Sequence, residues 1–152
     1  MYEILVPELR DDPAGIGYAE MTDEQRMAAF YADTQTAVVS TRATWRAMLA
    51  ALGPEITATI KAKIDAAAQT NPAIALAADM LTTYSDGGGL DIGHHYTRAV
   101  IDQLVASSVL TEPEGSAIKA MAETKTSRSK ILGISPADGH FSSARNMIGG
   151  DA

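Results

Sequence analysis

Two adjacent histidines, His94 and His95, come closest to a metal site, because Asp91 stands three residues before His94. Imidazole nitrogens and carboxylate oxygens are common zinc ligands, but a zinc site needs three or four of them at suitable spacings. Neighbouring side chains on a helix point about 100° apart, and the remaining histidine is His140. We therefore expect no metal, and we expect His94 and His95 to face solvent or an interface.

No other residues have the spacing of a known active site. Gly87, Gly88 and Gly89 are consecutive, but the Gly-Lys-Ser/Thr of a phosphate-binding loop does not follow them. The chain has no Gly-x-Ser-x-Gly sequence of the kind that presents a nucleophilic serine in hydrolases. It also has no cysteine. We therefore expect a protein that is not an enzyme and that holds no cofactor.

The charge of the chain argues against nucleic acid as a partner, because its net charge is −7 and phosphates attract lysine and arginine. Two helical patterns around a short turn are compatible with a helix-turn-helix, but the candidate recognition helix offers little beyond Lys119 and Lys125. No apolar run approaches the roughly 20 residues of a membrane helix, and no signal peptide is evident at the N-terminus. We expect neither nucleic-acid binding nor membrane insertion.

The elements that would position a site are helices, and the best-defined pair lies between Leu90 and Gly133. Thr111 and Glu114 have the form of a capping box, in which each side chain accepts a hydrogen bond from the backbone N–H of the other residue. On either side, apolar residues recur at the spacing of one helical face. The pattern predicts a C-terminal helical hairpin, with apolar faces formed by Val100, Ile101, Leu104 and Val105 and by Ala117, Ile118, Met121 and Ala122.

Helical periodicity continues through most of the chain, so we expect an all-α fold, a compact multi-helical single domain of about six or seven helices. We expect these helices to begin near polar capping residues, namely Thr22, Thr41, Asn71, Asp91 and Ser135. The apolar faces predict a core that contains Trp45, Leu49, Ile60, Leu81, Ile101, Leu104, Ile118 and Met121.

We expect one domain over residues 1–152, since this length suits a single hydrophobic core. Residues 1–6 are expected to form a short arm that Pro7 separates from the first helix, and residues 149–152 a frayed tail. Residues 35–40 are polar and β-branched and are expected to be extended, but a strand this short cannot form a sheet alone. Residues 85–89 are expected to form a flexible loop.

The arm and the distribution of charge favour an assembly over an isolated monomer. The arm is apolar, and the helix expected over residues 72–84 is apolar on two faces, as in an interface or a central helix. The first third of the chain is acidic and the last third carries a cluster of basic residues; these charges belong either to ordinary solvated helix faces or to complementary ends that meet between subunits. The expected interface residues are Tyr2, Ile4, Leu5, Val6, Lys125, Arg128 and Lys130.

Two blocks of the sequence resemble small proteins encoded by tailed bacteriophages. The first is LRDDPAGIGYAEMTDEQ, and the second is VIDQLVASSVLTEPEGSAIKAMAETKTSRSKILGI followed by SSARNM. The positions that carry the second resemblance are Leu110, Thr111, Glu114, Ser127, Arg128, Leu132 and Gly133. The blocks consist of caps and turns, so the resemblance implies a fold and a gene of the virion-structure module, and it brings no catalytic residues.

From these observations we expect a non-enzymatic bacteriophage structural or assembly protein, associated with the tail or the adhesion apparatus. Its expected partners are other virion proteins and further copies of itself, and its expected location is the virion, assembled in the bacterial host cytoplasm. The alternative is a soluble phage-encoded protein that binds and inhibits a host factor, by acidic mimicry of nucleic acid.

Overall fold

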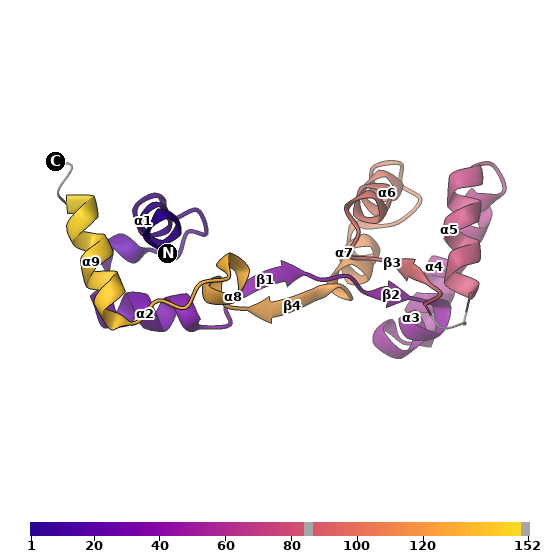
Figure 1. Cartoon of the computed structure of the whole chain (residues 1–152). Helices are drawn as coiled ribbons and strands as arrows, with labels where there is room; N and C mark the ends of the chain where they lie inside the picture. The colour runs from indigo at the N-terminus through magenta and orange to yellow at the C-terminus, as the bar shows by residue number, and fades with distance from the viewer. Residues whose placement is uncertain (84–86, 150–152) are drawn as a thin grey trace. The chain divides into compact units, whose positions relative to one another are not determined.

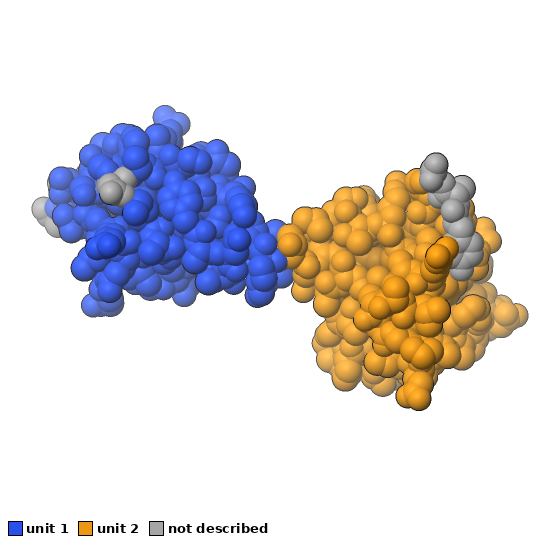
Figure 2. Space-filling model, turned by 90° about the horizontal axis from the view of Figure 1, so that it is seen from below, with its two compact units in different colours: residues 1–37, 125–152 blue, residues 38–124 orange. Residues whose placement is uncertain are grey.

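A computed structural model describes residues 1–83 and 87–149, except for the side chain of Asp138. The described chain is mostly helical and carries a few short strands, so the predicted helical class is confirmed but the fold is not strictly all-α (Figure 1). The chain forms two compact units instead of the one domain expected over residues 1–152 (Figure 2). Unit 1 comprises residues 1–37 and 125–152, and unit 2 comprises residues 38–124.

Each unit has its own set of helices. Those of unit 1 are α1 (Tyr2–Asp11), the 3-10 helix η1 (Tyr18–Glu20), α2 (Asp23–Tyr31), α8 (Arg128–Leu132) and α9 (Asp138–Gly149). Those of unit 2 are α3 (Trp45–Leu52), α4 (Pro54–Ala68), α5 (Pro72–Thr82), α6 (His95–Ala106) and α7 (Glu112–Ala120). The predicted loop over residues 85–89 and the predicted tail over residues 149–152 lie partly outside the described residues.

The predicted arm over residues 1–6 is wrong, because these residues begin α1, which continues through Pro7. The side chains of Tyr2, Leu5, Val6 and Leu9 follow the i, i+3, i+4, i+7 spacing of one helical face. Leu5 and Leu9 are buried, and Tyr2 and Val6 pack against the same core. This burial outweighs the one backbone hydrogen bond that a proline removes from a helix interior.

The core of unit 1 joins both ends of the sequence. Phe30 of α2 meets Phe141 of α9 edge to face, with ring centroids 5.6 Å apart. Leu5 and Tyr18 are buried in the same cluster. Residues 1–37 and 125–149 therefore share one core, and neither segment buries its apolar face without the other.

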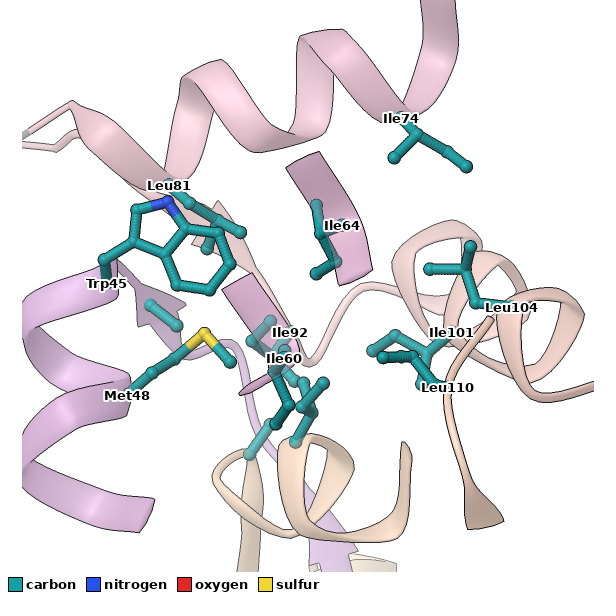
Figure 3. Close-up of a cluster of buried hydrophobic side chains, with 13 residues drawn as sticks. Trp45, Met48, Ile60, Ile64, Ile74, Leu81, Ile92, Ile101, Leu104 and Leu110 are labelled. Carbon is teal, nitrogen blue, oxygen red and sulfur yellow. The ribbon is translucent and has the colours of Figure 1, made fainter. Parts of the chain in front are cut away.

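The core of unit 2 collects apolar side chains from α3 to α7. Figure 3 shows Trp45 and Met48 of α3 and Ile60 and Ile64 of α4 pointing into one cluster with Leu81 of α5. The predicted core residues that are confirmed as buried are Trp45, Ile60, Leu81, Ile101, Leu104 and Ile118.

Two members of the predicted core differ. Met121 is partly buried against the cluster, because α7 ends at Ala120 and Met121 already lies at its C-cap. Leu49 is 47% exposed, so its prediction is wrong. Trp45 and Met48 fill the buried stripe of α3, and Leu49, about 100° further round the helix than Met48, falls outside it.

The predicted absence of a sheet is also wrong. The strands β1 (Gln35–Val38) and β4 (Glu123–Thr126) form one two-stranded sheet, and β2 (Arg42–Ala43) and β3 (Leu90–Asp91) form another. The extended conformation predicted for residues 35–40 is confirmed over β1. Beside β3, a Cβ on Gly93 would lie 2.0 Å from the carbonyl oxygen of Val39, so only glycine fits this close approach.

The residues at which the helices begin can be compared with the predicted capping residues. Thr22 and Thr111 both form capping boxes, and Asn71 caps α5, as predicted. The predictions for three other caps are wrong, since Thr44 caps α3, His94 caps α6, and α9 begins at Asp138, three residues after Ser135. Asp91 instead accepts hydrogen bonds from the Ser40 hydroxyl and from the backbone N–H of Thr41 and Gly93, at 2.6, 3.0 and 2.9 Å. These bonds hold the pKa of Asp91 below its usual value.

The helices α6 and α7 pack against each other within unit 2. A Cβ on Gly115 would lie 2.5 Å from Cγ2 of Val105, so the glycine allows α7 to approach α6 closely. After Ala120 the chain turns into β4 instead of extending α7. The second helix of the predicted C-terminal hairpin is therefore shorter than expected, and the hairpin as such stays a prediction.

The two leucines Leu104 and Leu76 provide a matched test of this core. Leu104 of α6 is 8% exposed and Leu76 of α5 is 64% exposed, and both belong to unit 2. We expect Leu104→Ala to lower the free energy of unfolding by about 2–5 kcal/mol, through lost burial and a residual cavity. Leu76→Ala should change it by less than about 0.5 kcal/mol. Urea unfolding followed by circular dichroism measures both, and equal losses in the two variants would contradict the description of this core.

Candidate protein interface

The predicted interface residues of the N-terminal segment do not form one exposed patch. Leu5 is fully buried in unit 1, and Tyr2 and Val6 are partly buried against the same core. Ile4 is 41% exposed and is the member of the group that faces solvent most openly. In this structure the apolar face of residues 2–6 is covered by its own unit.

The predicted basic interface residues make contacts within unit 1. The Arg128 guanidinium donates two hydrogen bonds to the Glu8 carboxylate, from Nε at 2.8 Å and from Nη2 at 2.5 Å. Lys130 Nζ lies 3.1 Å from Asp33 Oδ1, and Lys125 Nζ lies 3.2 Å from Thr36 Oγ1. The acidic and basic ends of the sequence thus meet inside one chain, which the composition alone did not distinguish from a contact between subunits.

The ion pair between Glu8 and Arg128 is buried, with side-chain exposures of 3% and 13%. The hydrogen bonds to Glu8 raise the pKa of Arg128. The hydroxyl of Tyr18 is buried and has no hydrogen-bond partner among the described residues; burial, and then the charge of Glu8, raise the pKa of this phenol. Arg128 and Tyr18 are thereby held in their ordinary protonated states at neutral pH.

The described surface of unit 2 includes a groove between α3 and α4. Thr44 caps α3, and Gly53, at a φ of 83°, makes the turn after which Pro54 begins α4. The groove is shallow and open, measures about 310 Å³, and is lined by the exposed side chain of Leu49 together with Pro54 and Ala58. Its size falls at the low end of ordinary binding pockets.

Polar groups in the lining of this groove are incompletely paired. Trp45 Nε1 and Thr57 Oγ1 are buried without a hydrogen-bond partner in the described part of the chain. A buried donor without a partner costs about 1–3 kcal/mol. Lys61 Nζ lies 5.5 Å from the centroid of the Trp45 ring, within the range of a cation–π contact, and 2.5 Å from Asp65 Oδ2. Arg46 also lines the groove and is exposed.

A second space in unit 2 is small and apolar. It measures about 40 Å³ and is lined by core side chains such as Met48, Ile64, Leu81 and Leu104. Ligand pockets in proteins usually measure about 300–1,000 Å³. This space is therefore too small for a ligand, and the groove between α3 and α4 is the better candidate of these two.

A partly buried ion pair joins α4 to α7 within unit 2. Lys63 Nζ donates to both carboxylate oxygens of Glu114, at 2.7 and 2.8 Å. The backbone N–H of Thr111 donates to the same carboxylate at 2.7 Å. The hydrogen bond from Lys63, followed by that from Thr111, holds the pKa of Glu114 below its usual value.

The histidines that opened the sequence analysis are exposed, as expected for a solvent-facing pair. The rings of His94 and His95 stack with centroids 4.6 Å apart, and His94 Nδ1 accepts from the backbone N–H of Tyr96. Among residues 1–83 and 87–149, no three histidine, cysteine or acidic side chains are grouped as metal ligands. None of the described helices combines the length and hydropathy needed to cross a bilayer.

Comparison with known proteins adds no relative: no family model, no curated protein and no solved structure matches this chain. The groove is not evident from helical periodicity, which places Leu49 in the core. The sequence Leu52-Gly53-Pro54 could have indicated the groove, because a one-residue connection between two helices holds their surfaces next to each other.

The Glu8–Arg128 pair predicts a strong effect of one substitution. Arg128→Ala leaves the Glu8 carboxylate buried without its partner, which should lower the free energy of unfolding of unit 1 by about 3–5 kcal/mol. Lys130→Ala is the control, since its pair with Asp33 is exposed on both sides and such pairs contribute about 0–1 kcal/mol. Thermal unfolding measured by near-ultraviolet circular dichroism distinguishes them; similar losses in both would show that the buried pair is not a major contact.

The Glu114 contact predicts a pH dependence. Because the folded-state pKa of Glu114 lies below the unfolded value, about 4.3, its contribution to stability is complete above that value and is lost as the pH falls through the folded pKa. Glu114→Gln should therefore lower stability at pH 7 and flatten the loss of stability on acidification below about pH 5. Urea unfolding from pH 7 to pH 3 measures both slopes, and parallel curves for the variant and the original protein would refute the assignment.

Proposed function

We propose that this protein is a non-enzymatic bacteriophage structural or assembly protein, associated with the tail or the adhesion apparatus of the virion. It binds other virion proteins and further copies of itself. Its place of action is the virion, assembled in the bacterial host cytoplasm. This proposal starts from the resemblance carried by residues 9–25, 100–134 and 142–147.

The observation that supports the proposal most directly is the number of large apolar side chains left on the described surface. On unit 2 they include Leu49, Ile56, Leu76 and Tyr96, with exposures of 47%, 47%, 64% and 70%. Single exposed apolar residues are normal on soluble proteins, but Leu49 also lines the groove between α3 and α4, and apolar surface exposed at a groove is typical of sites that bind proteins. Such surfaces suit a component that becomes covered in an assembly.

The short length of the individual helices also suits an assembly role. The longest described helix, α4, has 15 residues. Contacts with neighbouring proteins would add buried surface that a small unit cannot supply alone. The predicted self-association now rests on these surfaces and no longer on a free N-terminal arm.

Particle composition tests the proposal. In purified particles of the phage that encodes this chain, quantitative mass spectrometry should find the protein in a fixed ratio to a known virion protein. For an assembly factor that is released before completion, the protein should instead be found in purified assembly intermediates. Particles made without the gene should be defective in the tail or in adsorption.

The alternative function makes a different prediction in the same experiment. A protein that inhibits a host factor would be abundant in infected cells and absent from both particles and intermediates, and loss of its gene would leave particle structure intact. That outcome would overturn the proposal. A matched control is a phage in which the gene is interrupted and the protein is supplied from a plasmid.

A further inference from the structure

We propose that the groove between α3 and α4 binds an acidic segment of a partner protein, which inserts one bulky apolar side chain against Leu49 and places carboxylates beside Arg46 and Lys61. This inference goes beyond the proposed function and does not depend on it. A virion component and a protein that binds a host factor could both use such a groove.

The apolar part of the groove is the first support. Leu49 is 47% exposed although it lies on a helix whose neighbouring apolar residues, Trp45 and Met48, are buried. Pro54 and Ala58 continue the lining on α4. A volume of about 310 Å³ accommodates one large side chain together with part of the backbone that carries it. This is the arrangement in which a single apolar residue anchors a bound segment.

The charge of the groove is the second support. Its lining contains Arg46 and Lys61 and no acidic residue, on a chain whose net charge is −7. Lys61 pairs with Asp65, just outside the lining, so Arg46 is the cation of the lining that forms no ion pair with a described residue. At least nine of the twelve lysine and arginine side chains form an ion pair with a carboxylate in the described part of the chain, and Arg46 is not among these nine. A segment with carboxylates would therefore meet a complementary local charge at Arg46, on a chain that is negatively charged as a whole.

The buried donors nearby do not provide this recognition. Trp45 Nε1 and Thr57 Oγ1 are covered, so a docked segment cannot reach either atom without moving its side chain. The exposed guanidinium of Arg46 can instead bind a carboxylate through two parallel hydrogen bonds. The Lys61 ammonium lies over the Trp45 ring and is already paired with Asp65, so Arg46 supplies most of the positive charge that a docked carboxylate would meet.

The position of Trp45 gives a direct readout, because it is the single tryptophan of the chain and lines the groove. We would select messenger-RNA-displayed random peptides on the full-length protein. Enriched peptides are expected to carry aspartate or glutamate next to a bulky apolar residue and to shift the fluorescence emission of Trp45. Synthetic versions of the enriched peptides then serve as the probes for affinity measurements.

Matched variants locate the binding. Arg46→Glu and Leu49→Asp should each weaken peptide binding by about tenfold or more, whereas Leu76→Asp, at an exposed leucine on α5 outside the groove lining, should change affinity by less than about twofold. A peptide whose carboxylates are replaced by lysine should bind Arg46→Glu better than it binds the original protein. Circular dichroism at neutral pH verifies that every variant is folded.

Several results would overturn the proposal. These are a selection that enriches no peptide, enriched peptides without carboxylates, and a loss of affinity in Leu76→Asp that matches the loss in Leu49→Asp. A concentration-dependent dimer that Arg46→Glu dissociates would show by sedimentation that a second copy of this chain fills the groove. None of these results bears on particle composition, so a failure here is distinguishable from a failure of the proposed function.

Discussion

The buried ion pair between Glu8 and Arg128 is the contact on which the organisation of unit 1 depends. It joins two residues separated by 120 positions in the sequence, with hydrogen bonds of 2.8 and 2.5 Å. Around it, residues 1–37 and 125–149 share the core that contains Leu5, Phe30 and Phe141. Removing two charges from water is costly unless they pair well, so this geometry strongly disfavours arrangements in which the two segments separate. Unit 2 is, in sequence, an insertion between them.

Unit 2 reaches its stability in a different way, from an apolar core with polar contacts at its margin. The bond between Lys63 and Glu114 joins α4 to α7, and Gly115 lets α7 approach α6. Between α3 and α4 a groove stays open to solvent, with Leu49 outside the core. The tight turn at Gly53 places α3 and α4 side by side, and the proposed docking surface is the groove between them.

The sequence predicts those features that depend on local chemistry. The capping boxes at Thr22 and Thr111 and the burial of Ile60 and Leu104 follow from patterns within one or two helical turns. Features that depend on distant residues are not predictable in this way. Pro7 suggests a break, but the helix persists because the core of unit 1 receives its apolar face. The β1–β4 and β2–β3 pairs join segments far apart in the chain, and the partner of Arg128 could have been any of several acidic residues.

The most direct test of this organisation is native-state hydrogen exchange of the full-length protein and of Arg128→Ala, resolved by mass spectrometry of peptic fragments. If unit 1 depends on the Glu8–Arg128 pair and unit 2 has its own core, the substitution should accelerate exchange in residues 1–37 and 125–149. The fragments of residues 45–120 should keep their protection. Equal acceleration in both sets of fragments would show that the two units unfold as one and would contradict this account.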